Sequence, residues 1–173
     1  METTTTVQLP KTATPGPEVA ALAPFYKNAT WTGVIEAGGM GPGSPKMIGK
    51  GSAQCRLIQS GLWYDCDFEQ SQYLVDGTFV LKWQLHWITG WDPKAGEYRA
   101  TSADNNGPTL EIYRGKLDDK RLVYEPVQPT LPKIRLTWEL TEADNAKWRN
   151  EYSLDGKNWS LIEQYDMHLT GRS

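Results

Sequence analysis

Glu163 is the acidic side chain whose surroundings most suggest chemistry. It lies in a segment whose alternate residues are apolar, namely Trp159, Leu161, Tyr165 and Met167. A tight turn centred on Gly156 and Lys157 places Asn150 directly opposite it. A carboxylate held against apolar groups has a raised pKa, which suits a general acid or base. The alternative interpretation is a satisfied structural pair, or a wet position at the mouth of a barrel.

Arg114 is the candidate for a fixed positive charge, next to either a ligand carboxylate or Glu163. It shares an alternating face with Leu110 and Ile112. The register across residues 105–108 is ambiguous by one residue, however. The other alternation turns Glu111 and Tyr113 inward instead, and both orientations stay open.

An aromatic lining is expected on the same interior surface as Glu163. Its predicted members are Tyr64, Trp83, Trp87, Trp148, Tyr152 and Tyr165. Such rings can hold a flat organic molecule, and buried tyrosine hydroxyls need hydrogen-bond partners that a ligand can supply. The alternative is that the rings simply fill a core.

The longest element that positions these groups is the stretch of residues 79–91, FVLKWQLHWITGW. Its odd positions are apolar except for Thr89, whereas its even positions include Lys82, Gln84 and His86. A period of two over this length predicts a long strand with one dry face and one wet face. His86 is therefore expected to face solvent.

The rest of the chain repeats strand and turn. Strands are predicted at residues 30–36, 51–59, 62–73, 78–91, 97–104, 109–115, 121–125, 133–141, 146–154 and 159–169. Residues 17–23 predict a short helix that Pro24 ends. We therefore predict an all-β fold, a single antiparallel up-and-down barrel of about eight to ten strands with a short N-terminal helix. The barrel domain is expected to span residues 17–173, after a disordered tail at residues 1–16.

Two predicted hairpins can be checked against each other. A turn at residues 60–61 pairs Cys55 with Cys66 and Leu57 with Tyr64, while a turn at residues 76–77 pairs Cys66 with Trp87. Both turns place the same face inward. The two cysteines are expected at a widely spaced pair position in a reducing compartment, so two free thiols are predicted.

Composition excludes several classes of function. The net charge of -3 provides no basic patch for nucleic acid or an anionic membrane. Residues 1–18 have no apolar run that would serve as a leader, so a cytoplasmic protein is expected. Asp65, Asp67 and Glu69 alternate on one face without the spacing of a calcium loop, so we interpret them as a solvated face and predict no metal site.

Four short stretches carry a family resemblance. They are residues 22–25 (LAPF), 31–33 (WTG), 90–93 (GWDP) and 152–159 (YSLDGKNW). With them the chain resembles an uncharacterised bacterial family of lipocalin-like, calycin-type barrels. This resemblance implies a closed antiparallel barrel with an internal cavity, and it supplies no catalytic residue.

A more distant resemblance is to haem-binding barrels of the nitrobindin type, which use a histidine near the C-terminus. His168 lies at about that place. Alternation turns it away from the tryptophan face, so no cofactor is expected.

Together these features predict a barrel that binds a small hydrophobic, aromatic molecule. The alternative is a cofactor-independent lyase, isomerase or cyclase that uses Glu163 as its acid or base. A homodimer formed through an exposed strand edge is compatible with either function.

Overall fold

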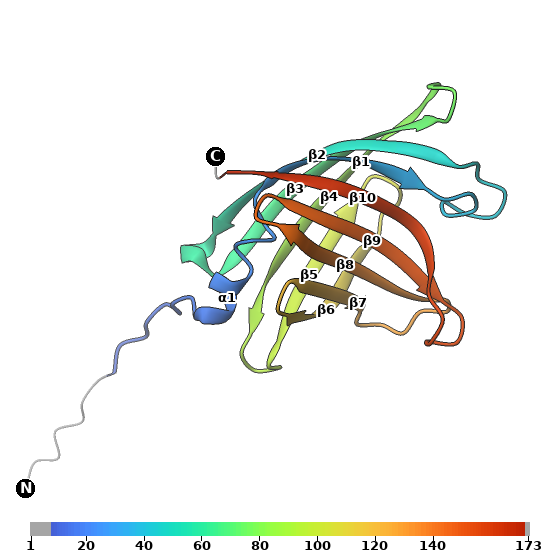
Figure 1. Ribbon diagram of the computed structural model, residues 1–173. Helices are drawn as coiled ribbons and strands as arrows, with labels where there is room; N and C mark the ends of the chain where they lie inside the picture. The colour runs from blue at the N-terminus through green and yellow to red at the C-terminus, as the bar shows by residue number, and fades with distance from the viewer. Residues whose placement is uncertain (1–7, 172–173) are drawn as a thin grey trace, which may run out of the picture.

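Ten antiparallel strands close into one barrel in the computed structural model, which describes residues 8–171 (Figure 1). A short helix, α1 (Pro17–Ala21), precedes them. The strands are β1 (Asn28–Ile35), β2 (Met47–Ile58), β3 (Trp63–Leu74), β4 (Phe79–Asp92), β5 (Glu97–Asp104), β6 (Leu110–Asp118), β7 (Arg121–Pro126), β8 (Lys133–Glu142), β9 (Asn145–Ser153) and β10 (Ser160–Thr170). Each strand pairs with its neighbours in sequence, and β10 pairs with β1 to close the barrel. The predicted up-and-down barrel with a short N-terminal helix is confirmed.

The hairpins of β2, β3 and β4 have the predicted register. Cys55 lies opposite Cys66, Leu57 lies opposite Tyr64, and Cys66 lies opposite Trp87. Because side chains alternate between the two faces of a strand, this register fixes which residues of all three strands point into the barrel.

The hairpin of β9 and β10 departs from the prediction at one point. Asn150 lies opposite Glu163, as predicted. The same symmetric turn would place Tyr152 opposite Leu161, but Tyr152 lies opposite Ser160. The register shifts between Leu161 and Glu163, where β10 carries one extra residue. This β-bulge leaves Leu161 exposed, so the predicted apolar face does not continue past Glu163.

The segment after α1 closes one end of the barrel. Leu22, Phe25 and Tyr26 are buried there. The Tyr26 hydroxyl accepts a hydrogen bond from Trp87 Nε1 at 3.2 Å and donates one to the Tyr124 hydroxyl at 3.3 Å. Residues 22–26 therefore form a plug at this end of the barrel, and the hydrogen bonds of Tyr26 anchor the plug to side chains of the interior.

The predicted disordered tail lies partly outside the described residues, which begin at residue 8. Residues 8–16 are exposed and form neither helix nor strand. Within residues 8–171, no helix is long and apolar enough to span a membrane.

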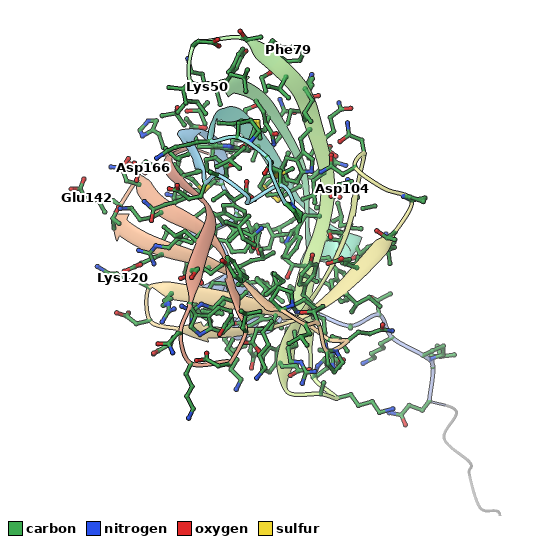
Figure 2. The ribbon with its side chains drawn as sticks, turned by 90° about the vertical axis from the view of Figure 1, so that its right-hand side faces the viewer. Lys50, Phe79, Asp104, Lys120, Glu142 and Asp166 are labelled. Atoms are coloured by element: carbon green, nitrogen blue, oxygen red, sulfur yellow. A yellow bond between two sulfur atoms is a disulfide. The ribbon has the colours of Figure 1, made fainter. Side chains whose placement is uncertain are left out.

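The β3–β4 hairpin extends beyond the other strands at the end away from α1 (Figure 1). Phe79 lies at its tip, and Asp104 lies farther down the same side of the barrel (Figure 2). Phe79 is 56% exposed and packs edge-on against Tyr73. The first residues of β4, including Phe79, therefore extend beyond the barrel. The apolar residues from Trp83 to Trp87 face the interior.

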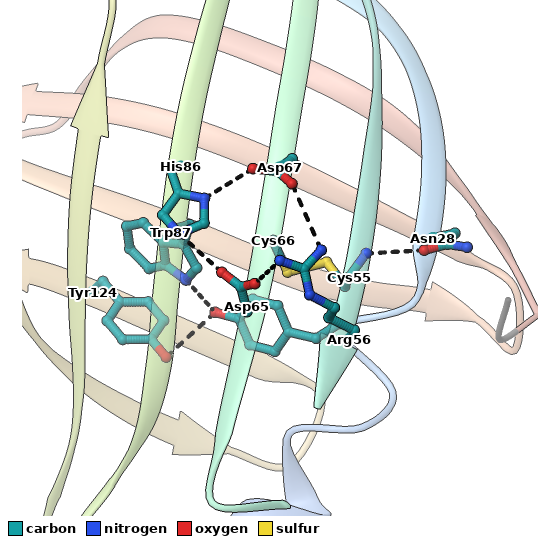
Figure 3. The surroundings of a disulfide bond; sticks show 10 residues. Asn28, Cys55, Arg56, Asp65, Cys66, Asp67, His86, Trp87 and Tyr124 are labelled. Atoms are coloured by element: carbon teal, nitrogen blue, oxygen red, sulfur yellow. Dashed lines mark hydrogen bonds and ion pairs between the residues drawn. A yellow bond between two sulfur atoms is a disulfide. The ribbon is translucent and has the colours of Figure 1, made fainter. Parts of the chain in front are cut away.

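The prediction of two free thiols is wrong, because Cys55 and Cys66 form a disulfide across β2 and β3 (Figure 3). Their Cα atoms are 4.2 Å apart, the spacing of a close, non-hydrogen-bonded pair. The Cys55 N–H donates instead to Asn28 Oδ1 at 2.9 Å.

On the outer face beside the disulfide, His86 lies between two carboxylates (Figure 3). Its Nε2 is 2.9 Å from Asp65 Oδ1, and its Nδ1 is 2.8 Å from Asp67 Oδ1. Arg56 lies opposite Asp65 in the neighbouring strand and forms an ion pair with it. Asp65 is nevertheless buried, which corrects the expectation that it is solvated.

Candidate functional site

The barrel contains a cavity of about 310 Å³. Five tryptophans line it, Trp31, Trp83, Trp87, Trp138 and Trp148. The rings of Trp87 and Trp138 lie 5.7 Å apart, next to the buried Tyr124. On the other side of Trp138, the ring of Trp148 stacks on Tyr165 at 5.3 Å. Aromatic rings that contact one another therefore form a large part of the cavity wall.

Glu163 is the carboxylate that lies deepest among these rings. Asn150 Nδ2 donates to its Oε1 at 3.3 Å, and the Tyr165 hydroxyl donates to its Oε2. Burial raises the pKa of Glu163, and these two donors reduce the increase because they favour the ionised form. The site thus has a protonatable group in the wall of the cavity.

A chain of hydrogen bonds continues from Glu163 across the barrel wall. The Tyr165 hydroxyl accepts from Gln70 Nε2 at 2.9 Å, and Gln70 Oε1 accepts from Trp31 Nε1 at 2.7 Å. Because each group donates to the next, the one proton of Tyr165 is committed to Glu163. Burial raises the pKa of Tyr165, and the nearby Glu163 raises it further. Tyr165 therefore acts as a hydrogen-bond donor to the carboxylate.

A second glutamate and tyrosine repeat this arrangement on β6. The Tyr113 hydroxyl donates to Glu111 Oε2 at 2.7 Å and lies 3.5 Å from Ser102 Oγ. Burial raises the pKa of Tyr113. Beside them, Trp83 Nε1 donates to Asp104 Oδ2 at 3.4 Å. The cavity wall therefore has a second acidic region, formed by Asp104 of β5 and Glu111 of β6.

Glycines in β2 make room for the buried hydrogen-bond chain. A Cβ atom on Gly49 would lie 2.8 Å from the Tyr165 ring and 2.9 Å from Gln70 Cδ. One on Gly51 would lie 2.4 Å from the Trp31 ring. The absence of side chains at these positions lets the three polar groups meet inside the wall.

Gly49→Ala is expected to lower the free energy of unfolding by about 1–3 kcal/mol, because the new methyl group overlaps Tyr165 and Gln70. Urea unfolding measures the change. Gly171→Ala is the matched control, because a Cβ atom there has no atom within 4 Å. Equal stability of the two variants would show that the hydrogen-bond chain is not packed against Gly49.

The stability of Glu163→Gln relative to the native protein should depend on pH. The native carboxyl has its pKa raised by burial, so it stabilises the fold fully below the ordinary glutamate pKa of about 4.3. This contribution is lost as the pH rises through the raised value. The native protein should therefore lose stability relative to Glu163→Gln from acidic to neutral pH, as measured by urea unfolding across that range. Glu125→Gln removes one exposed carboxylate and serves as the control, and identical trends for both variants would contradict the assignment.

Of the two orientations left open for Arg114, the structure has the outward one. Arg114 is exposed on the outer face of β6, where its guanidinium donates to the Val127 carbonyl at 3.0 Å. The other alternation holds, so Glu111 and Tyr113 face the cavity. Arg114 lies opposite Arg99 in the neighbouring strand and has no contact with Glu163.

The remaining predicted residues divide into two groups. Trp83, Trp87, Trp148, Tyr165, Asn150 and Glu163 line the cavity. Tyr64 does not line it, because it is buried near the plug and stacks on Tyr26 at 5.3 Å. Tyr152 also lies outside the lining, in the part of β9 that the bulge in β10 displaces from its predicted partner.

The sequence prediction missed several residues of the lining. They are Trp31, Gln70, Gln72 and Trp138, whereas Glu111 and Tyr113 belong to the alternative register that was left open. For Gln70 and Gln72 the signal was present, because they continue the inward alternation of Phe68 along β3. Trp138 could have been found in the same way from its position opposite Trp148.

Neither histidine of the chain lines the cavity. His168 is exposed on β10, with Nδ1 3.4 Å from Asn145 Oδ1, and His86 belongs to the outer ion-pair cluster. A haem held by a histidine, as in nitrobindin-type barrels, therefore has no axial ligand here.

Comparison with solved structures supports the barrel. The chain is similar to Rv2717c from M. tuberculosis, known from a crystal structure, with a TM-score of 0.58 at 13% identity. The match covers 90% of this chain and 99% of that one. A likeness at this identity shows the fold alone.

Comparison by sequence identifies a family. No curated protein matches the chain. Residues 14–171 match the family described as "Protein of unknown function (DUF1579)", and so the chain belongs to the DUF1579 family.

Proposed function

We propose that this barrel binds a small aromatic molecule in its internal cavity. The observation that carries the proposal is the 310 Å³ cavity, whose wall combines five indoles with buried, hydrogen-bonded polar groups. Ligand pockets have volumes of about 300–1,000 Å³, and a few polar groups in an apolar wall orient the ligand. The cavity is at the lower end of this range, so the ligand is a compact molecule of one or two rings.

The rings that surround the cavity are held by one another and by hydrogen bonds. Trp87 contacts Trp138 and Tyr113, and Trp148 stacks on Tyr165. Rings fixed in this way lose little further conformational freedom when a ligand enters. A planar ligand can therefore gain contact area without a large entropic cost.

Native mass spectrometry of the protein purified from its own host tests the proposal directly, because a bound small molecule would add its mass to the folded protein. Tryptophan fluorescence then measures affinity for the identified compound. Trp83→Ala should weaken binding, whereas Trp159→Ala should not, because Trp159 lies outside the cavity lining and contacts Arg135. A protein that carries no molecule and binds no small aromatic compound would contradict the proposal.

A second function is favoured by one specific observation, the raised pKa of Glu163 at the cavity wall. In this alternative the protein is a cofactor-independent lyase, isomerase or cyclase. Glu163 would transfer a proton to or from a phenolic or carbonyl-bearing substrate. Arg114 lies on the outer face and does not reach an oxyanion in the cavity, and the Tyr113 hydroxyl would have to leave Glu111 to take that role.

Glu163→Gln separates the two functions once the compound is known. A proton-transfer role predicts that turnover falls by about 10²–10⁴-fold while affinity is largely retained. Unchanged turnover, or an equal loss of turnover and affinity, would exclude Glu163 as the proton-transfer group.

The other expectations about partners remain proposals. A homodimer would not form through a free edge of the barrel, because every strand of the closed barrel already has two neighbours. Lack of binding to nucleic acid and membranes rests on the net charge of -3. The disulfide weighs against the proposed cytoplasmic location, because reducing compartments keep thiols reduced.

A further inference from the structure

We infer that the ligand of this cavity is an organic cation, an ammonium group joined to an aromatic ring. This inference rests on the proposed binding function and specifies the class of ligand. Three independent features of the wall support it: its charge, its unpaired hydrogen-bonding atoms and its aromatic faces.

The charge of the wall is entirely negative. Asp104, Glu111 and Glu163 line the cavity, whereas no Lys, Arg or His is among the described lining residues. Glu111 on β6 and Glu163 on β10 are four strands apart in the ten-stranded order, so they come from facing walls. A positive group between them would interact favourably with both, whereas a ligand carboxylate would be repelled.

The arginines near the cavity are all engaged outside it. Arg149 contacts Glu139 at 3.0 Å and Gln164 at 3.2 Å. Arg135 forms a two-point contact with Glu151, and Arg114 donates to the Val127 carbonyl. The acidic side chains of the wall therefore receive no positive partner from these arginines.

The unpaired polar atoms of the wall are hydrogen-bond acceptors. Gln72 is only 2% exposed and lines the cavity, yet its Oε1 has no hydrogen-bond partner. Asn150 Oδ1 is also buried without a partner, and its orientation is fixed because Nδ2 donates to Glu163. A buried acceptor without a donor costs free energy, so this wall favours a ligand that brings N–H groups.

The indoles suit the same ligand. A cation within about 6 Å of a tryptophan face is attracted by the negative charge of the ring face. The aromatic part of the ligand can then contact the remaining rings, as the proposed function requires. An ammonium group joined to an aromatic ring is therefore complementary to the acids, the acceptors and the rings together.

Isothermal titration calorimetry at neutral pH with three matched probes tests the inference. They are 2-phenylethylammonium, the neutral 2-phenylethanol and the anionic 3-phenylpropanoate. The ammonium probe should bind about tenfold more tightly than the alcohol, because cation–π and acidic contacts together are worth at least the 1.4 kcal/mol that corresponds to this ratio. The anion should show no measurable binding.

Glu111→Gln should remove most of the preference for the ammonium probe over the alcohol. Asp104→Asn is a second variant of the same wall, to be used if the first does not fold, and Glu125→Gln is the control, because Glu125 lies outside the cavity lining. An alcohol or anion that binds as tightly as the ammonium probe would overturn the inference and leave the proposed function standing. Failure of all three probes to bind would overturn the inference and count against the proposed function as well.

Discussion

Trp87→Ala is expected to lower the free energy of unfolding by about 3–5 kcal/mol, the usual cost of removing a buried tryptophan. Trp87 is 2% exposed and contacts the rings of Tyr113, Tyr124 and Trp138. Those rings have partners of their own and cannot all move into the space left behind. The substitution therefore leaves a void as well as removing apolar contacts.

The same substitution also releases the plug. Trp87 Nε1 donates to the Tyr26 hydroxyl, and Tyr26 donates to Tyr124, whose hydroxyl lies 2.6 Å from Thr89 Oγ1. Removal of the indole leaves the buried Tyr26 hydroxyl without its donor. The loss of stability should therefore include weaker attachment of the N-terminal segment, which hydrogen exchange in residues 17–26 would detect.

Urea unfolding measures the loss, with Trp91→Ala as the matched control. Trp91 is partly exposed on the same strand and packs against one ring, that of Tyr98. Its removal should cost about 1–2 kcal/mol. A loss for Trp87→Ala no larger than that for Trp91→Ala would show that Trp87 does not hold the interior together.

The strands could be predicted because their pattern is local. In β4, apolar and polar residues alternate, and the turns that flank it contain Asp-Gly or Asp-Pro pairs. Such turns also fix the register, which is why the pairing of Cys66 with Trp87 was predictable. The contact between Asn150 and Glu163 followed from the same kind of argument.

The orientation of Arg114 could not be settled because the loop before it is not a tight turn. Residues 105–109 separate β5 from β6, and a change of one residue in such a loop reverses the faces of the next strand. The structure pairs Ser102 with Glu111, so Arg114 points outward. The bulge near Leu161 is a similar case, since alternation alone does not show an inserted residue.

The hydrogen-bond chain from Trp31 to Glu163 could not be derived from hairpins alone. Trp31 belongs to β1, Gln70 to β3 and Tyr165 to β10. Their meeting depends on the closure of β10 against β1 and on the glycines of β2 between Trp31 and Gln70. These are long-range features, and the sequence alone did not fix how the barrel closes.

The cysteine error came from the length of one loop. A two-residue turn at residues 60–61 makes the pair of Cys55 and Cys66 a widely spaced one. In the structure the loop spans residues 59–62, between the pair of Ile58 and Trp63, and the Leu62 N–H bonds the Gln59 carbonyl at 3.3 Å. The longer loop leaves each residue opposite the same partner. It changes the hydrogen-bonding pattern, so that pairs with a wide Cα separation become pairs with a close separation, and the reverse. Cys55 and Cys66 consequently occupy a close pair, where a disulfide can form.

Reduction of this disulfide should lower the free energy of unfolding by about 3 kcal/mol, because the bond restricts the unfolded chain across a sequence separation of 11 residues. Urea unfolding with and without reductant measures the change, and thiol titration confirms that the bond has opened. The doubly substituted Cys55→Ala, Cys66→Ala protein should not respond to reductant, since it has no bond to break. Full stability of the reduced native protein would contradict this prediction. It would mean that the unfolded chain is equally restricted with and without the covalent bond between β2 and β3. The disulfide would then contribute little to the stability of the fold.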